Sequence, residues 1–313
     1  MSRPGPVCEC RRSLNKAQWF ASIRNPGSIS ARLELQSLRE IRELLAARGL
    51  TPRHRFGQNF LHDHGKIREL VDAADLQPGQ TVLEVGPGTG ALTDCLLERE
   101  VRVVAVEIDR DLASLIRDRF GDRVTLVEGD CLAKGRRLSS EVVAALEGSA
   151  FKLVANLPYQ AASPLMASLL MHHPECLGQW VTIQKEVVDR LVAEPGTKAW
   201  GPLTAIVRAF ASARRITTLP PGCFWPAPKV TSAMAELLPV ASEHRPEDPD
   251  GFARFVTRLL SKRRKQIGGV LGQDIVTSLG IDATMRAETL GASKLIDIRD
   301  QLPSGHPLLQ EQT

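Results

Sequence analysis

The chain has 313 residues, of which 43% are hydrophobic and 24% are charged, and these proportions are typical of a folded globular protein. Apolar runs stay short of the roughly 18 residues that span a membrane, so we expect no membrane partner. The formal net charge of +4 fits an ordinary enzyme, and the six cysteines form no repeated C-x-x-C pairs. This cysteine pattern favours free thiols over a structural zinc site, and we expect no metal.

The first 33 residues differ in composition from the rest of the chain. Basic residues, prolines and serines are frequent there, Glu9 is the single acid, and no apolar period is sustained. This composition predicts a disordered basic leader. A basic leader also resembles an organellar transit peptide, although a misassigned start codon is the simpler explanation. We therefore expect a cytoplasmic protein, or an organellar one if the leader is a transit peptide.

Two helices are predicted before the first strand. Apolar residues from Leu35 to Leu45 recur with a helical period, and Gly49 ends that helix. A second helix is predicted over residues 67–74. The basic loop between them, residues 51–63, carries two aromatic side chains and taken alone predicts a solvated surface loop.

A glycine-rich loop follows the first predicted strand. Residues 81–85 have the apolar character of a strand, the loop begins with Gly86 and Gly88, and an amphipathic helix starts at Ala91. This succession opens a nucleotide-binding βαβ unit, in which the glycines let the backbone approach a ligand closely. The loop also satisfies the dinucleotide fingerprint, so it leaves both a nicotinamide cofactor and S-adenosylmethionine open.

Acidic residues stand at the ends of the next two predicted strands. Glu107 follows a strand about 20 residues after the first glycine, where a carboxylate accepts hydrogen bonds from ribose hydroxyls. Asp130 follows the strand over residues 124–127, where it is placed to accept a hydrogen bond from an adenine amino group. Asp130 is also explained as a plain turn residue, and Asp109 is more simply a helix N-cap.

The turn that begins at Asn156 is the expected centre of the chemistry. Residues 151–155 have the length and apolar character of a buried parallel strand. Asn156 then lies at the carboxyl edge of the sheet, where ligands bind in open α/β folds. Pro158 fixes its own φ and biases Leu157 toward extended geometry, which stiffens the turn. Tyr159, the only tyrosine of the chain, follows directly.

The remaining sequence predicts the end of the sheet and a helical region. We expect a helix from Ser163-Pro164 to Met171, a strand over residues 179–184, a helix over residues 185–192, and last strands over residues 203–211 and 230–238. The connection over residues 223–229 is interpreted as a hydrophobic turn or as part of a substrate pocket. These elements predict an α/β domain over residues 34–240.

A composition change after Pro239 marks a linker, and residues 241–313 are predicted to form a helical domain. This domain includes the basic run Lys262, Arg263, Arg264 and Lys265 on a helix. Such a run usually means a solvated helix face. Next to an adenosine-handling domain, a contact with RNA phosphates explains it better.

Several segments recur together in one known family. They are Gly57-Gln58-Asn59-Phe60-Leu61, residues 84–93, residues 105–109, Gly129-Asp130, Asn156-Leu157-Pro158-Tyr159, residues 226–232 and residues 262–265. As a set they resemble the small-subunit ribosomal RNA adenine N6,N6-dimethyltransferases. The resemblance implies a Rossmann-like S-adenosylmethionine-dependent methyltransferase sheet with a small C-terminal helical domain. It also implies two adjacent target adenosines, in the hairpin near the 3′ end of small-subunit ribosomal RNA.

The resemblance further implies roles for individual residues. S-adenosylmethionine is expected to contact Asn59, Leu61, Gly86, Gly88, Glu107, Asp130 and Asn156. The catalytic turn is expected to be Asn156, Leu157, Pro158 and Tyr159, and RNA is expected to contact Arg263, Arg264 and Lys265. The expected partners are small-subunit ribosomal RNA and the immature small ribosomal subunit, bound by a monomer.

The chemistry of this turn follows from the weakness of the nucleophile. The lone pair of an adenine amino group is delocalised into the ring. We expect the Asn156 side-chain oxygen and the Leu157 or Pro158 carbonyl to accept its two N–H bonds, which favours the pyramidal geometry needed for in-line attack on the methyl group. Catalysis is then mainly positioning. Tyr159 is expected to stack on the target base, which must turn out of its helix to enter.

Other functions stay open at this point. One is a non-catalytic RNA-binding assembly or transcription factor on the same fold. Another is a large-subunit ribosomal RNA adenine methyltransferase, which matches less well because that group more often has isoleucine at the position of Leu157. A DNA or protein amino methyltransferase gives no reason for the basic C-terminal run. Trp200, where the family usually has tyrosine, and Gln160, where a smaller polar residue is common, bear on substrate fit.

Overall fold

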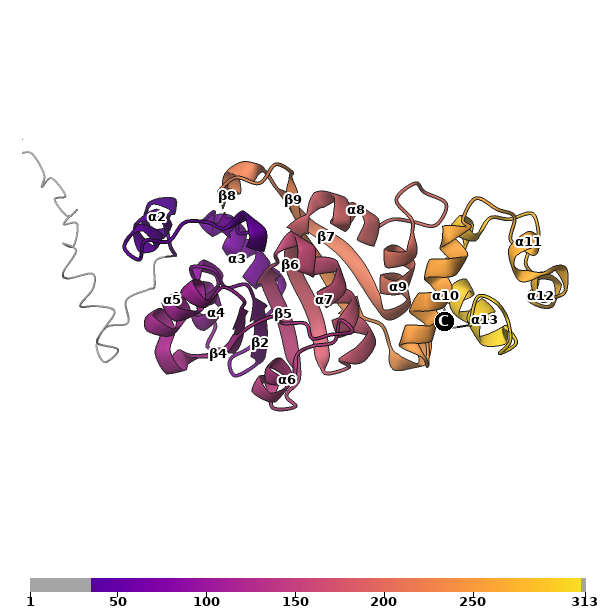
Figure 1. Ribbon diagram of the computed structural model, residues 1–313, viewed down its shortest axis with the longest axis horizontal. Helices are drawn as coiled ribbons and strands as arrows, with labels where there is room; N and C mark the ends of the chain where they lie inside the picture. The colour runs from indigo at the N-terminus through magenta and orange to yellow at the C-terminus, as the bar shows by residue number, and fades with distance from the viewer. Residues whose placement is uncertain (1–34, 311–313) are drawn as a thin grey trace, which may run out of the picture. The chain divides into compact units, whose positions relative to one another are not determined.

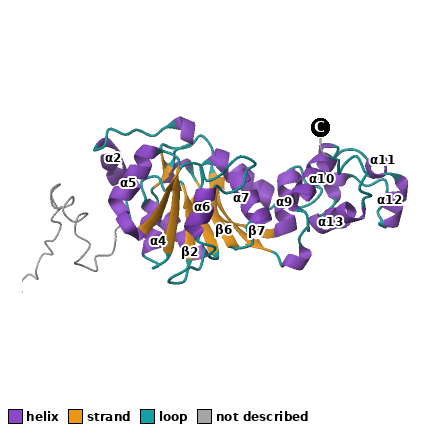
Figure 2. Ribbon diagram, turned by 60° about the horizontal axis from the view of Figure 1, so that its bottom comes forward, coloured by secondary structure: helices purple, strands orange, loops and turns teal. Residues whose placement is uncertain are grey.

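A computed structural model describes residues 35–310 of the chain, so the predicted leader lies outside the described residues. Within residues 35–310, seven strands form one sheet in the order β4-β3-β2-β5-β6-β9-β7. The strands from β4 to β6 pair in parallel, and β9 pairs antiparallel with both β6 and β7. Helices cover both faces of the sheet (Figure 1, Figure 2). The predicted Rossmann-like α/β fold is confirmed.

The strands of this sheet are β2 (Thr81–Val85), β3 (Arg102–Glu107), β4 (Val124–Glu128), β5 (Phe151–Asn156), β6 (Cys176–Gln184), β7 (Ala211–Leu219) and β9 (Ser232–Pro239). A separate antiparallel pair is formed by β1 (Phe60–Leu61) and β8 (Phe224–Trp225). The helices up to the last strand are α2 (Leu38–Ala46), α3 (His64–Ala73), α4 (Ala91–Leu97), α5 (Arg110–Phe120), α6 (Ser140–Leu146), α7 (Tyr159–His172), α8 (Lys185–Leu191) and α9 (Pro202–Phe210). The helices after β9 are α10 (Pro249–Ser261), α11 (Gly268–Leu271), α12 (Gln273–Ser278) and α13 (Ala292–Gln301).

Buried side chains on the two faces of the sheet belong to different clusters. Val82 and Leu83 are neighbours on β2, and they point to opposite faces because successive side chains of a strand alternate. Val82 belongs to a buried cluster that includes residues of α2, α3, α4 and α5. Leu83 belongs to a second cluster that includes residues of α6, α7, α8, α9 and the C-terminal helices. The alternation therefore explains why the central strands are apolar on both sides.

One predicted strand is a helix. Residues 203–211 were expected to form a strand, but Pro202–Phe210 is α9, with Pro202 in the first turn where its missing N–H costs no helical hydrogen bond. Its apolar residues at 203, 206, 207 and 210 follow a helical period. The strand of this region begins one residue later: β7 (Ala211–Leu219) is a polar strand at the edge of the sheet and pairs with β9.

The helix after the Asn156 turn begins earlier than predicted. It was expected to start at Ser163-Pro164, but α7 starts at Tyr159 and Pro164 lies inside it. The Pro158 carbonyl accepts the amide hydrogens of Ala161 and Ala162, which closes the first turn before Pro164 is reached. Tyr159 is therefore held by helical geometry rather than by a free loop.

The basic run lies in a turn and not on a helix, which corrects the prediction. Helix α10 ends at Ser261, and residues 262–265 lead through a turn to α11. Helices α10 and α13 contact α9, and their buried residues join the core on the Leu83 side of the sheet. The domain boundary near residue 240 stays a prediction from composition. None of the helices within residues 35–310 is both long and apolar enough to cross a bilayer.

Candidate active site

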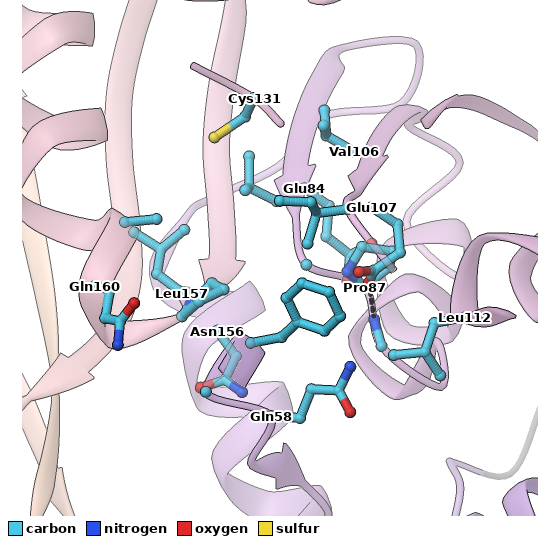
Figure 3. Close-up of a pocket in the computed structure, with 18 of the residues that line it drawn as sticks. Gln58, Glu84, Pro87, Val106, Glu107, Leu112, Cys131, Asn156, Leu157 and Gln160 are labelled. Carbon is cyan, nitrogen blue, oxygen red and sulfur yellow. Dashed lines mark hydrogen bonds between the residues drawn. The ribbon is translucent and has the colours of Figure 1, made fainter. Parts of the chain in front are cut away.

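A pocket lies at the carboxyl ends of β2, β3, β4 and β5, with a cavity of about 390 Å³. Every predicted cofactor and catalytic residue lines it: Asn59, Leu61, Gly86, Gly88, Glu107, Asp130, Asn156, Leu157, Pro158 and Tyr159. Figure 3 shows Asn156 at the end of β5 on one side of this pocket, with Glu107 and Leu112 on the other. The fold thus brings together residues that lie up to 100 positions apart in the sequence.

Glu107 holds the glycine loop from the neighbouring strand. Its carboxylate accepts the Gly88 amide hydrogen at 3.2 Å and the Asp109 amide hydrogen at 3.0 Å. Burial raises the pKa of Glu107 to about 7, although these two backbone hydrogen bonds act in the opposite direction. A carboxylate has about four acceptor positions, so both oxygens retain capacity for ribose hydroxyls.

The loop of Asn59 fixes the orientation of the Asn156 amide. The Asn156 Nδ2 donates to the Asn59 carbonyl at 3.0 Å. Because the nitrogen of this amide is engaged by the protein, its oxygen is left as the acceptor for an incoming donor. Phe60 and Leu61, the next two residues, form β1 and pair with β8. The loop that was predicted as a solvated surface loop is therefore one wall of the pocket.

The glycine loop and the Asn156 turn lie next to each other. Gly86 has a φ of 76°, and a Cβ built on it would lie 3.4 Å from the Pro158 ring. Gly88 has a φ of 60°, and a Cβ there would lie 2.9 Å from the Phe60 ring. Side chains at these two positions would both strain the backbone and fill the space between the walls. The positive φ favours glycine at both positions, and at Gly88 the close Phe60 ring also leaves no room for a side chain.

Tyr159 is linked to a strand that the sequence did not connect with it. Its hydroxyl lies 2.7 Å from the Ser232 Oγ, at the start of β9. Ser232 is fully buried, and Tyr159 is half-buried. The connection over residues 223–229 was left open between a hydrophobic turn and part of a substrate pocket, and its Trp225 stacks on Phe60 of the pocket wall. Ser232, just after it, holds Tyr159.

Asp130 makes the hydrogen bond of a turn residue and also lines the pocket. Its Oδ1 accepts the Leu132 amide hydrogen at 3.0 Å, which is the bond of a plain turn residue. The side chain also lines the pocket and is exposed, so the second oxygen can meet a ligand. Next to it, Cys131 is buried and burial raises the pKa of its thiol to about 12, so it presents an uncharged wall.

Two acidic residues in or near the pocket make contacts that the sequence did not predict. Glu84 is buried on β2 beside the loop, accepts the Thr93 hydroxyl at 2.7 Å, and has its pKa raised to about 8 by burial. The sequence signal that could have revealed Glu84 was an acidic residue inside an otherwise apolar strand. Asp109 caps α5 as predicted, and its carboxylate also binds Arg53 at 2.7 Å and Gln58 at 2.9 Å. These bonds fasten the Asn59 loop to the end of β3.

The basic run does not line the pocket. Arg263 is held by the Trp200 carbonyl at 3.3 Å and lies 3.7 Å from the Glu288 carboxylate. Arg264 and Lys265 are exposed, as is Lys262. Among residues 35–310 no group of three or more His, Cys, Asp and Glu side chains is arranged to hold a metal ion.

Known proteins with similar folds include two solved structures. A dimethyladenosine transferase from Plasmodium falciparum matches with a TM-score of 0.64 and 22% identity, over 76% of this chain and 95% of that chain. The 23S rRNA methyltransferase ErmE matches with a TM-score of 0.57 and 22% identity, over 78% of this chain and 99% of that chain. At this level of identity both matches show the fold alone.

Similarity of sequence is more specific. A ribosomal RNA small subunit methyltransferase A from Cupriavidus metallidurans is 38% identical over 262 residues, which cover 80% of this chain and 92% of the relative. The protein of the same name from Aromatoleum aromaticum is 37% identical over 261 residues, 82% of this chain and 96% of the relative. Residues 49–302, more than half of the chain, match the family described as ribosomal RNA adenine dimethylase. The chain therefore belongs to the ribosomal RNA adenine dimethylase family.

Proposed function

We propose that this chain transfers methyl groups from S-adenosylmethionine to N6 of two adjacent adenosines, in the hairpin near the 3′ end of small-subunit ribosomal RNA. Family membership makes the chain an S-adenosylmethionine-dependent ribosomal RNA adenine dimethyltransferase. The proposal adds the subunit and the position in the RNA. It is supported by relatives named for the small subunit, which match over 92% and 96% of their own lengths.

One observation carries the proposal. The glycine loop, expected to hold the methyl donor, and the Asn156 turn, expected to hold the acceptor, line the same pocket and lie so close that a Cβ built on Gly86 would be 3.4 Å from the Pro158 ring. A donor methyl and an acceptor nitrogen bound to these two segments are neighbours. Bringing the reactants together in this way is the main contribution that a methyltransferase needs from its protein.

The hydrogen bonds within the turn indicate which of its acceptors are free to bind the target amino group. The Asn156 oxygen is available because its amide nitrogen donates to Asn59. The Pro158 carbonyl already accepts from Ala161 and Ala162, as the start of α7. We therefore assign the second acceptor to the Leu157 carbonyl rather than to Pro158. Two acceptors aimed at one amino group draw its hydrogens away from the plane of the ring and expose the lone pair to the methyl group.

Tyr159 supplies the surface for the target base. Its ring lines the pocket beside Asn156, and its hydroxyl is held by Ser232. A tethered ring offers a stacking face with little loss of side-chain freedom. Base stacking of this kind contributes about 1–3 kcal/mol. Glu107, across the pocket from Asn156, is proposed to accept from the ribose of the cofactor, and Asp130 from its adenine.

The RNA is proposed to contact the turn after α10. Arg264 and Lys265 are exposed there, whereas Arg263 packs against Trp200 and Glu288 and supports the turn. We propose that the chain acts as a monomer on the immature small subunit. Its location is then where small subunits assemble, which is the cytoplasm, or an organelle if the leader is a transit peptide.

The test is mass spectrometry of ribosomal RNA after incubation of immature small subunits with the protein and S-adenosylmethionine. The expected result is dimethyladenosine at two adjacent positions of the 3′ hairpin, absent with Asn156→Ala. Large-subunit RNA serves as the matched control and should stay unmodified. Methylation of the large-subunit RNA alone, or firm RNA and cofactor binding without any methyl transfer, would replace this proposal with one of its alternatives.

A further inference from the structure

The segment that precedes the family-matched region contacts the cofactor loop. The match begins at residue 49, whereas α2 spans Leu38–Ala46 and follows Leu35 and Gln36. Ile41 and Leu45 on α2 are buried in the same cluster as Ala91 and Leu92, the first turn of α4 after the glycine loop. We call residues 35–48 the α2 segment. It belongs to the core around the pocket.

Gln36 reaches the glycine loop directly. Its side chain is buried, and its Nε2 donates to the Thr89 carbonyl at 2.9 Å. The Gln36 backbone carbonyl lies 2.9 Å from the His64 Nε2, which fixes the start of the α2 segment on α3. Arg119 of α5 donates to the same Thr89 carbonyl and binds Asp94 at 2.8 Å. Two donors from outside the loop therefore converge on one carbonyl within it.

The loop needs such external contacts because of its composition. Gly86, Gly88 and Gly90 all have positive φ values. Glycine enters positive and negative φ with similar ease, so a loop of this kind loses much conformational entropy when it becomes fixed. Contacts from its surroundings have to select the conformation in which Gly88 donates to Glu107. The bond from Gln36 to Thr89 is one of these contacts.

The α2 segment also supports the loop through a stack of side chains on its other side. The Arg42 guanidinium lies over the Trp225 ring, 5.2 Å from its centroid. Trp225 is stacked on Phe60 with 6.3 Å between centroids. The Phe60 ring in turn packs against Gly88, with 2.9 Å to a Cβ position there. Gln36 and Arg42 thus reach the same loop by two separate routes.

We propose that Gln36 and Arg42 are positioning residues for the cofactor, through which the α2 segment holds the glycine loop in its cofactor-binding conformation. Neither residue lines the pocket. Their substitution should therefore weaken S-adenosylmethionine binding without removing any group that touches the cofactor or the target base. The inference rests on the proposed cofactor of this pocket, and it extends the cofactor machinery to residues before the family-matched region.

The test is Gln36→Met in the full chain, which keeps the length of the side chain and its apolar packing and removes the donor. We expect the Kd for S-adenosylmethionine, measured by calorimetry, to rise about threefold to tenfold, because loss of one hydrogen bond lowers the fraction of molecules with the loop in place. The KM for S-adenosylmethionine should rise equally, with kcat unchanged once the cofactor is saturating. Amide hydrogen exchange should accelerate at Gly88 and Gly90.

Arg42→Gln and Arg39→Ala complete the experiment. Arg42 is exposed, so Arg42→Gln should leave the fold intact. We expect it to raise the Kd for S-adenosylmethionine by up to about fivefold, which corresponds to the loss of one surface cation–π contact. Arg39, on the same helix, is 86% exposed and pairs with Glu43, so Arg39→Ala should leave the Kd unchanged.

Wild-type affinity in both Gln36→Met and Arg42→Gln would overturn the inference. So would a rise in Kd accompanied by a proportional fall in kcat and in Tm, since that pattern means general loss of structure. If the wild-type protein itself fails to bind S-adenosylmethionine, the proposed function fails instead. The Kd of the wild type, measured first, therefore separates failure of the proposed function from failure of this inference.

Discussion

The pocket and the basic turn after α10 differ in how the side chains proposed to act there are held. In the pocket, Asn156 is oriented by Asn59 and Glu107 is bonded to the glycine loop. In the turn, Arg264 and Lys265 are exposed side chains. Groups that must meet a reacting atom are fixed in place, because small displacements there are costly. Groups that meet phosphates act through charge over a longer range and tolerate movement.

The largest expected effect comes from Asn156→Ala. The variant removes an acceptor for the target amino group, and we expect the single-turnover methylation rate to fall at least about a hundredfold, as for the loss of a preorganised polar group in other active sites. Melting temperature and RNA affinity should stay close to those of the wild type, because the side chain is only partly buried. A rate within a few-fold of the wild type would remove Asn156 from the reaction.

The next effect in size is expected for Glu107→Ala. Loss of the carboxylate should weaken S-adenosylmethionine binding by about 1.5–3 kcal/mol, because hydrogen bonds to a charged group are lost. Calorimetry measures this directly, and Asp122→Ala, at an exposed position just after α5, is a suitable control. Tight NAD binding by the wild type without S-adenosylmethionine binding would contradict the assignment of Glu107 and the glycine loop to an S-adenosylmethionine site.

Glu107 also predicts a pH dependence. Burial raises its pKa from 4.5 to about 7, so the folded protein holds a proton that the unfolded chain releases. The contribution of this carboxyl to the free energy of unfolding is therefore present below pH 4.5 and is lost as the pH rises through 7. Cofactor affinity should change in the opposite sense and strengthen as the pH rises through about 7 and the acceptor becomes ionised. Glu107→Gln should flatten the profile of cofactor affinity, whereas the stability profile keeps the contribution of Glu84, whose pKa is raised to about 8.

A somewhat smaller effect is expected at Tyr159. Tyr159→Ala should lose about 1–3 kcal/mol of stacking, which corresponds to roughly a tenfold to hundredfold fall in kcat/KM. Tyr159→Phe keeps the ring and should retain most activity. Ser232→Ala removes the same hydrogen bond from the other side, so it should match Tyr159→Phe, and the double variant should be no worse than either.

If the Tyr159 ring merely packs under the turn, the same proteins behave differently. Tyr159→Ala would then lower the melting temperature and weaken cofactor binding together with activity. A stable Tyr159→Ala that binds cofactor and methylates at the wild-type rate would exclude this turn as the target-base site.

The smallest effect at physiological salt is expected in the basic turn. Joint replacement of Arg264 and Lys265 by glutamine should weaken RNA binding and lower the salt slope by about 0.7–0.9 for each phosphate that the turn no longer neutralises. Cofactor affinity should not change. Arg263→Gln provides the contrast, because Arg263 is bonded to Trp200 and close to Glu288. This variant should lower the melting temperature and leave the salt slope nearly unchanged. An unchanged salt slope in filter binding would make the turn an ordinary solvated surface.

The site was predictable where its signals are local. The strand, glycine loop and helix around Gly86 follow one another along the chain, and Glu107, Asp130 and Asn156 stand at strand ends as expected. Contacts between distant segments were not predictable. Gln36 meets Thr89 across 53 positions and Tyr159 meets Ser232 across 73, and neither residue type signals such a partner.

Two elements were mispredicted for a related reason. The apolar run over residues 203–211 fits a buried strand and a buried helix equally by composition, and Pro202 at its start was the deciding signal. The polar sequence of β7 has weak strand character of its own. It becomes a strand because β9 offers it hydrogen-bond partners, which is a property of the folded sheet.

The polar edge strand β7 has a consequence for how copies of the chain meet. An exposed sheet edge invites another chain to add a strand, and natural proteins counter this with charges and bulges. Arg214 and Arg215 lie on β7, and its register with β9 shifts between Arg215 and Thr217. This edge is therefore a poor template for aggregation. A sedimentation coefficient that stays constant as protein concentration rises is the expected sign that the sheet does not extend from one molecule into the next.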